Sequence, residues 1–128
     1  MRRLVRSLLL CLATVLATVA VGALTAVVAH VRDENGTPWG DTMDGHEHVD
    51  KFHGLGGSDE LLGRGDNDKL WGGPSSGDIL RGMENNDELD NADGYANDKG
   101  YCGNGSDTLF QDGFGADQTD GTCENVSG

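Results

Sequence analysis

The chain is poor in the residues that build a large apolar core. Aromatic side chains make up 5% of its 128 residues, and there are only two prolines. Apolar residues crowd into the first thirty positions, so the 36% hydrophobic fraction overstates what is left for a folded core. A chain of this length has room for one domain at most, and we expect no large catalytic core.

Positive charge is also scarce. Nine Lys and Arg face 22 Asp and Glu, which gives a formal net charge of −13. Such acidity repels phosphates, so electrostatic binding of nucleic acid is excluded and cations are the expected partners. The sequence contains no Gly-x-Ser-x-Gly elbow, no His-Glu-x-x-His motif and no phosphate loop. We therefore predict that the chain is not an enzyme.

The first 29 residues have the pattern of an export signal. Arg2, Arg3 and Arg6 precede an apolar run of 22 residues at positions 8–29. A basic start, an apolar run and small residues at its end are typical of a cleaved signal. We predict a helical signal peptide over residues 1–29 and hence a secreted, extracellular protein. The alternative is an uncleaved membrane anchor at the cell surface, because a helix of this length spans roughly 30 Å of hydrocarbon.

Removal of this segment enlarges the charge imbalance. The remaining 99 residues keep all 22 acidic side chains and only six basic ones, a net charge of −16. A chain so charged, with so few large apolar residues, would ordinarily be disordered. Something other than a hydrophobic core must therefore order its carboxylates.

Aspartates recur with a period of about nine residues. They are Asp41, Asp50, Asp59, Asp68, Asp78, Asp87, Asp98 and Asp107. Glycines precede them by five or six positions at Gly36, Gly45, Gly54, Gly63, Gly72 and Gly82. Large apolar residues follow them by two positions, except at Gly100, and these are Met43, Phe52, Leu61, Leu70, Leu80, Leu89 and Leu109. Three residue classes that keep one phase over eight units indicate a repeat architecture.

Each unit has the composition of a tight turn followed by a very short strand. Glycine allows the positive φ of the turn, aspartate directs a carboxylate into it, and the triplet around the apolar residue sends one side chain inward. A single unit buries nothing, so the units must stack, and stacking brings carboxylates of neighbouring turns together. Close like charges need a cation, and a divalent ion with oxygen ligands meets that need.

Two segments resemble a known repeat family. Residues 63–73 read Gly-Arg-Gly-Asp-Asn-Asp-Lys-Leu-Trp-Gly-Gly, and residues 103–110 read Gly-Asn-Gly-Ser-Asp-Thr-Leu-Phe. Both resemble the RTX, or haemolysin-type, calcium-binding nonapeptide Gly-Gly-x-Gly-x-Asp-x-apolar-x. The resemblance covers residues 36–110. It implies an all-β fold, a right-handed parallel β-roll, in which calcium ions sit between turns that are two units apart.

Carried over to this chain, the resemblance implies a row of calcium ligands along each edge of the roll. One row is Asp41, Asp59, Asp78 and Asp98, and the other is Asp50, Asp68, Asp87 and Asp107. Backbone oxygens of the turns complete the six to eight ligands that Ca²⁺ prefers, with Gly57, Gly65 and Gly105 as candidates. Asp66, at the fourth turn position, is a further candidate. The apolar residues are expected in two facing rows, Met43, Leu61 and Leu80 on one sheet and Phe52, Leu70, Leu89 and Leu109 on the other.

Some units depart from the pattern. Trp39, His46 and His48 stand where the first two turns should have glycine or small residues. One residue is inserted around Pro74, and the seventh unit is two residues longer and has Gly100 at its apolar position, so we expect a bulge there. The pattern is kept best around Asp59, Asp68, Asp78, Asp87 and Asp107.

Two other kinds of metal site fit the sequence less well. His46, His48 and His53 could bind Zn²⁺ or Cu²⁺, but the sequence fixes no third ligand, and exposed histidines are the simpler interpretation. An EF-hand loop needs Asp at position 1 and Glu at position 12, where the best frame has Leu89 and Gly100. The repeat turns are therefore the preferred calcium sites.

Three cysteines are an odd number for an exported chain. Cys11 lies in the apolar run, so Cys102 and Cys123 remain after cleavage. Two cysteines in an exported protein favour a disulfide, here worth roughly 3 kcal/mol, which would fasten residues 111–128 as a cap over the last coil. The Asp-Gly-Thr-Cys-Glu-Asn-Val ending also resembles that of secreted actinobacterial proteins with such repeats.

Taken together, the sequence predicts a monomeric, secreted calcium-binding β-roll of about four coils, joined to its signal by a short linker at residues 30–35. Ions that bind the folded stack and not the unfolded chain favour folding by linkage. The alternative is an extracellular adhesion or ice-binding solenoid with purely structural calcium. Its outward residues, such as Lys51, Glu60 and Ile79, do not form the regular Thr row of a lattice-matching face. The sequence identifies no protein or carbohydrate partner.

Overall fold

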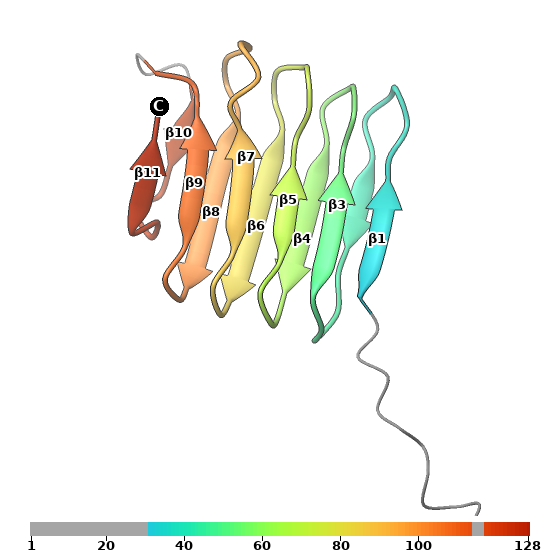
Figure 1. Ribbon diagram of the computed structural model, residues 1–128. Helices are drawn as coiled ribbons and strands as arrows, with labels where there is room; N and C mark the ends of the chain where they lie inside the picture. Colours follow the sequence, from blue (N-terminus) through green and yellow to red (C-terminus); the bar gives the residue numbers. More distant parts are fainter. Residues whose placement is uncertain (1–30, 114–116) are drawn as a thin grey trace, which may run out of the picture.

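The computed structural model describes residues 31–113 and 117–128, which form two parallel β-sheets packed face to face (Figure 1). The described residues contain no helix, and therefore none long and apolar enough to cross a membrane. The strands are β1 (Arg32–Asn35), β2 (Thr42–Asp44), β3 (Asp50–His53), β4 (Glu60–Arg64), β5 (Lys69–Trp71), β6 (Ile79–Glu84), β7 (Glu88–Asn91), β8 (Lys99–Asn104), β9 (Thr108–Gln111), β10 (Gln118–Thr119) and β11 (Asn125–Ser127). The predicted all-β parallel roll is confirmed; the predicted signal helix at residues 1–29 lies outside the described residues.

Successive strands alternate between the two sheets. The first sheet has the order β1-β3-β5-β7-β9-β11, and the second has the order β10-β8-β6-β4-β2. Every pairing is parallel, and equivalent residues of successive coils are partners, as in Leu61 with Leu80 and Leu70 with Leu89. In Figure 1 the turns that follow first-sheet strands lie along the upper edge, and those that follow second-sheet strands lie along the lower edge.

Each central coil buries alternate residues, as the period of two in a strand requires. In β5 and its flanks, Asp68, Leu70 and Gly72 are buried, and Lys69 and Trp71 are half-buried. The apolar side chains of the two sheets meet in one core. Its two rows are those predicted, Met43, Leu61 and Leu80 from the second sheet and Phe52, Leu70, Leu89 and Leu109 from the first.

Gly100 interrupts the apolar row of the second sheet without leaving a gap. A Cβ built there would lie 2.7 Å from both methyl groups of Leu109, so the leucine fills the space of the absent side chain. The longer seventh unit also does not produce the bulge that we expected. Ile79 pairs with Lys99 and Arg81 with Tyr101 in unbroken register, and the extra residues lie in the upper turn before Lys99.

A polar strand covers the N-terminal end of the roll. The sequence assigned residues 30–35 to a linker, but Arg32–Asn35 form β1, which pairs with β3. Arg32 and Glu34 stand at inward-facing positions, form an ion pair of 2.8 Å, and place the guanidinium 5.5 Å from the ring centroid of Phe52. Charges at inward positions of an edge strand discourage pairing with another chain.

The C-terminal segment is a further coil rather than a separate cap. Gln118–Thr119 pairs with β8, and Asn125–Ser127 pairs with β9. The eleven strands therefore make about five coils, one more than the sequence predicted. Backbone hydrogen bonds hold these terminal strands in the sheets. Such bonds form without the glycine and aspartate spacing of the repeat, so the sequence pattern did not predict this coil.

Candidate metal centre

Aspartates point into the roll at both edges of the apolar core. Seven of the eight repeat aspartates are at most 3% exposed, and Asp41, in the first coil, is half-buried. In each central coil an inward aspartate begins the strand, an inward apolar residue follows, and a glycine usually ends it. From Asp41 to Asp87, each carboxylate faces the glycine that precedes its turn, while Asn91 and Cys102 stand at this position before Asp98 and Asp107.

Backbone hydrogen bonds join these carboxylates into two rows. Along the upper edge, one oxygen (Oδ1) of Asp59, Asp78, Asp98 and Asp117 accepts the backbone N–H of the row's preceding aspartate, beginning at Asp41. Along the lower edge, Asp68, Asp87, Asp107 and finally Glu124 do the same, beginning at Asp50. The two rows contain the two sets of aspartates that the sequence assigned to the two edges.

The second oxygen of the central carboxylates has no hydrogen-bond partner. These buried Oδ2 atoms belong to Asp59, Asp68, Asp78, Asp87, Asp98 and Asp107. A buried carboxylate oxygen without a donor is costly, because the charge has lost its water and gained nothing in return. The folded roll at neutral pH therefore needs a proton or a cation beside these six atoms.

The carboxylates at the ends of the rows are satisfied differently. Asp41 Oδ2 accepts the backbone N–H of Thr37 at 2.6 Å, and Asp50 Oδ2 accepts that of His46 at 2.8 Å. Asp117 Oδ2 likewise accepts the backbone N–H of Asp112, at 2.9 Å. In these three aspartates a backbone N–H thus compensates Oδ2, whereas the Oδ2 atoms of the six central aspartates have no donor.

Burial shifts the ionisation of the central aspartates. It raises the pKa of Asp68, Asp78 and Asp87 to about 7, and neighbouring aspartates add to the rise. The hydrogen bond from the backbone N–H of the preceding coil acts in the opposite direction and is the smaller effect. Burial also raises the pKa values of Asp59, Asp98 and Asp107.

Backbone oxygens lie beside the unpartnered carboxylate oxygens. A Cβ built on Gly82 would lie 2.7 Å from the carbonyl oxygen of Cys102 and against Asp87 Oδ2. At Gly54 the same point touches Asp59 Oδ2 and the carbonyl oxygen of Gly72. Glycine leaves the space beside its Cα free, and a carboxylate oxygen of one coil and a carbonyl oxygen of the next coil both face this space. An all-oxygen donor set of this kind suits a hard cation such as Ca²⁺.

The turn glycines that the sequence proposed as ligands lie where successive turns stack. Gly57 has a φ of 95°, and a Cβ on it would collide with the backbone of Trp39. A Cβ on Gly105 would collide with the carbonyl group of Asn85. Gly65 donates its N–H to the His46 carbonyl oxygen at 3.2 Å. Their role as calcium ligands stays a prediction.

No three Asp, Glu, His or Cys side chains cluster as a metal site within residues 31–113 and 117–128. The histidines are separated accordingly: His53 stacks on Trp71, with 4.3 Å between ring centroids, and His46 lies beside Arg32. This arrangement does not favour the alternative of a zinc or copper site. An ion in the carboxylate rows would need backbone or amide oxygens in addition to carboxylates.

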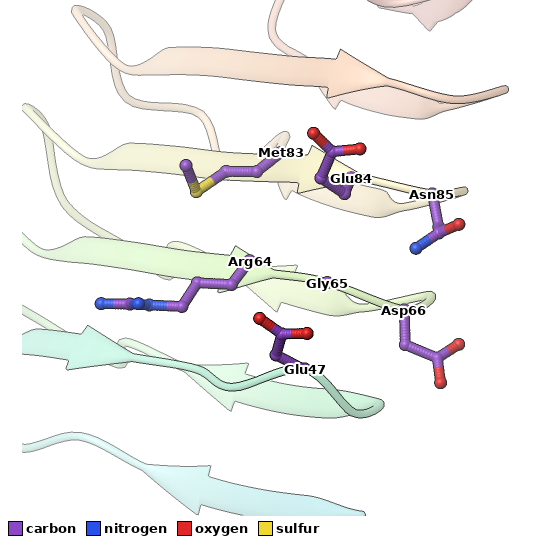
Figure 2. A pocket seen from close by; sticks show the side chains of 7 residues that line it. All are labelled: Glu47, Arg64, Gly65, Asp66, Met83, Glu84 and Asn85. Carbon is purple, nitrogen blue, oxygen red and sulfur yellow. The ribbon is translucent and has the colours of Figure 1, made fainter.

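Asp66 lies outside the buried rows. It is exposed, has a φ of 71°, and its Oδ1 accepts the backbone N–H of Asn67 at 2.9 Å. It belongs to an open groove of about 570 Å³ that crosses three lower turns (Figure 2), lined by Glu47, Arg64, Gly65, Asp66, Met83, Glu84 and Asn85. Figure 2 shows the Asp66 carboxylate pointing away from the strands, so this predicted ligand lies on the outside of the turn.

Four polar residues at or beside these rows were not predicted from the sequence. Asp117 and Glu124 extend them, and Asn91 and Gln111 carry buried side-chain atoms without partners. Asp117 follows Asp98 by 19 residues, within the drift of the repeat, so its spacing was a usable signal. Glu124 could not be predicted in this way, because the repeat pattern has aspartate and not glutamate at this position.

The predicted disulfide between Cys102 and Cys123 is confirmed. Their Cα atoms are 5.1 Å apart and 21 residues separate them in the sequence. Cys102 is fully buried in the core, at a position where earlier strands have glycine, and Cys123 packs against the same core. The bond therefore fastens the last coil to β8.

Breaking this bond should destabilise the C-terminal coil. Replacing both cysteines by serine should lower the free energy of unfolding by about 3 kcal/mol, because the open chain regains loop entropy. Thermal unfolding of the double variant and the parent, both with calcium, measures the loss. Treatment of the parent with a reductant should reproduce it, and an unchanged midpoint in both experiments would contradict the prediction.

The parallel sheets and the two rows of inward carboxylates define the chain as a β-solenoid of the β-roll type. No protein-family model, curated protein or solved structure matches it. Its function must accordingly be argued from its own residues.

Proposed function

We propose that the chain is a calcium-binding β-roll, which folds when calcium binds and has no enzymatic activity of its own. The observation that carries the proposal is the set of six buried aspartate Oδ2 atoms without a hydrogen-bond donor. In each of these carboxylates Oδ1 accepts a backbone N–H and Oδ2 is buried without a donor, so ionisation leaves negative charge on an oxygen that nothing compensates. Repetition along both edges matches an array of ion sites better than it matches a single active site.

Six aspartates are the proposed ligands: Asp59, Asp78 and Asp98 along the upper edge, and Asp68, Asp87 and Asp107 along the lower edge. Bound calcium would supply the positive charge that these carboxylates lack, and carbonyl oxygens of the turns would complete its ligand set. Asp41 and Asp50 also belong to the predicted ligands, but both carboxylates already accept backbone N–H groups. We therefore expect the central coils to bind calcium most strongly.

Calcium binding and folding are coupled in this proposal. The ligands come together only in the stacked coils, so the unfolded chain offers no equivalent site and each bound ion stabilises the folded state. We propose an extracellular location, where calcium modules work at about 10⁻⁴ to 10⁻³ M. The same linkage would keep the chain loose before export.

Circular dichroism of the full chain at pH 7.5 tests the proposal. We expect a disordered spectrum in chelator and a strand spectrum after calcium is added, with magnesium as the matched control. Magnesium should be much less effective, because it demands a small octahedral site and releases its water reluctantly. A strand spectrum that is already complete in chelator, or one that never forms with calcium, would overturn the proposal.

The outward face of the second sheet does not favour the adhesion or ice-binding alternative. Its first row of partners is Thr42, Glu60, Ile79, Lys99 and Gln118. A surface that matches a lattice needs one repeated side chain, and this row mixes both charges with polar and apolar groups.

A further inference from the structure

One position in the upper edge breaks the glycine column of the first sheet. Gly36, Gly54 and Gly72 directly follow β1, β3 and β5, and Asn91 takes the equivalent position in β7. Trp71 pairs with Asp90, and the Gly72 N–H donates to the Asp90 carbonyl oxygen at 3.0 Å, so Gly72 and Asn91 are neighbours in register. A polar side chain thus stands in the interior where the three preceding coils have glycine, and its partner in β9 is Gln111.

The Asn91 side chain reaches back toward the carboxylate of the coil before it. A Cβ built on Gly72 would lie 2.8 Å from Asn91 Oδ1 and 2.9 Å from Asp78 Oδ2, so both oxygens face the same glycine. Asn91 is 2% exposed and Asp78 is 0% exposed. Asp78 Oδ2 and both polar atoms of the Asn91 amide lack hydrogen-bond partners. Two unsatisfied side-chain oxygens therefore meet in a buried space.

The surroundings make this meeting unfavourable without a cation. In this orientation of the Asn91 amide two acceptors face one space with no donor between them, and the carboxylates of Asp59, Asp93 and Asp98 add negative charge near Asp78. A rotated amide would instead donate to Asp78 Oδ2, and Asn91→Asp, which has no donor at neutral pH, separates the two arrangements. An apolar side chain at position 91 would fill the same space without two facing acceptors.

We propose that Asp78 and Asn91 form a distinct calcium site in which the Asn91 amide oxygen is a second side-chain ligand. The inference rests on the proposed function and goes beyond it by assigning a ligand outside the aspartate rows. Carboxylate and amide oxygens are both ordinary calcium ligands. At Gly54, the equivalent point touches Asp59 Oδ2 and the backbone carbonyl oxygen of Gly72. With its second side-chain oxygen, the Asp78 site binds its ion before the Asp59 site as calcium is added.

Tb³⁺ in place of calcium reports on this site through Trp71. Energy transfer from tryptophan to bound Tb³⁺ falls steeply with distance, and Trp71 precedes Gly72 directly in the chain. The full chain carrying Trp39→Phe has Trp71 as its only tryptophan. We expect sensitised emission to rise with the first equivalent of Tb³⁺ and calcium to displace it.

Three variants in this background separate ligand from filler. Asn91→Gly restores the residue of the three preceding coils, and it should weaken the Tb³⁺ affinity measured from Trp71 emission by about 10-fold or more. Asn91→Asp keeps an oxygen at this position and should retain the binding. Asn97→Gly is the matched control, because Asn97 is an exposed residue of the same loop with a φ of 75°, and it should leave the emission unchanged.

Total calcium binding, measured by equilibrium dialysis, distinguishes a failure of the Asn91 site from a failure of the proposed function. If the chain binds calcium and folds but Asn91→Gly leaves the Trp71-sensitised titration unchanged, the Asn91 site is wrong and the proposed function stands. If Asn91→Asp weakens binding as much as Asn91→Gly, Asn91 acts through packing, and the site is again wrong. If no variant and no parent binds either ion, both the site and the proposed function fail.

Discussion

Without calcium, the roll should be folded near pH 4 and lose its strands as the pH rises through about 7. The reason lies in Asp68, Asp78 and Asp87, whose pKa values burial raises from 3.8 to about 7. At low pH a proton on each carboxylate removes the buried charge that the unpartnered Oδ2 atom cannot otherwise tolerate. At pH 8 these protons are gone and the negative charges repel one another inside the roll.

The sign follows from linkage. The folded chain holds these protons more tightly than the unfolded chain, so protonation favours the folded state. The contribution is complete below the unfolded pKa of 3.8 and falls as the pH rises, and it is lost above the folded pKa of about 7. This direction is opposite to that of an ordinary salt-bridged aspartate, which stabilises a protein above its pKa.

Far-UV circular dichroism in calcium-free buffer from pH 3.5 to 8 measures this transition. Its steepness should correspond to roughly three protons released on unfolding, one for each carboxyl group with a strongly raised pKa. In excess calcium the strand spectrum should persist at pH 8. Identical calcium-free spectra at pH 4 and pH 8 would contradict the prediction, whether both were folded or both unfolded.

Protons and calcium compete for the same buried oxygens in this scheme. Calcium should therefore add little stability at pH 4, where the central carboxyl groups are protonated, and most at pH 8. The stabilisation by calcium should thus increase with pH, because a proton or a calcium ion can each compensate the buried carboxylates. A merely solvated acidic surface would show neither the acid-induced fold nor the pH-dependent calcium effect.

The central coils were predictable because their side chains repeat the geometry of the fold. Asp68, Leu70 and Gly72 are spaced two apart, and each points inward, so the sequence pattern and the burial pattern are the same. The first strand was not predictable in this way. Arg32 and Glu34 occupy its inward positions as a charged pair, and only the backbone pairing with β3 shows that it belongs to the sheet.

The site was predictable at the level of residues and not at the level of atoms. Nine-residue spacing put the aspartates into two rows, but it does not say which carboxylate oxygens already have donors. Asp50 and Asp68 keep the same phase, yet Asp50 Oδ2 accepts the backbone N–H of His46 and Asp68 Oδ2 has no donor. That difference depends on the local course of each turn, which spacing alone does not encode.

Replacing Asp87 by asparagine should stabilise the calcium-free roll at pH 8 while it weakens the calcium response. Asp87 Oδ1 accepts the backbone N–H of Asp68 at 2.8 Å, and the amide oxygen of asparagine can accept the same bond. The amide N–H₂ replaces the unpartnered Oδ2 and can donate toward the Cys102 carbonyl oxygen, which faces the same glycine. A buried charge is thus exchanged for a hydrogen-bond donor, at the loss of one calcium ligand.

Asp117→Asn is the matched control, and the sign of its effect should be reversed. Asp117 Oδ1 accepts the backbone N–H of Asp98 at 3.2 Å and Oδ2 accepts that of Asp112 at 2.9 Å. An amide N–H₂ would face a donor in either orientation, so the calcium-free roll should lose about 1–3 kcal/mol. Because the calcium-free parent should have no strands at pH 8, thermal unfolding at pH 6, with chelator and with calcium, measures both variants against it. The same sign is expected at pH 6, since Asp87 is ionised in the unfolded chain at both pH values. Calcium should raise the unfolding midpoint of Asp87→Asn by less than that of the parent. If both variants changed the calcium-free stability in the same direction, the prediction would be wrong, and the unpartnered Oδ2 atoms would not explain why the central coils depend on calcium.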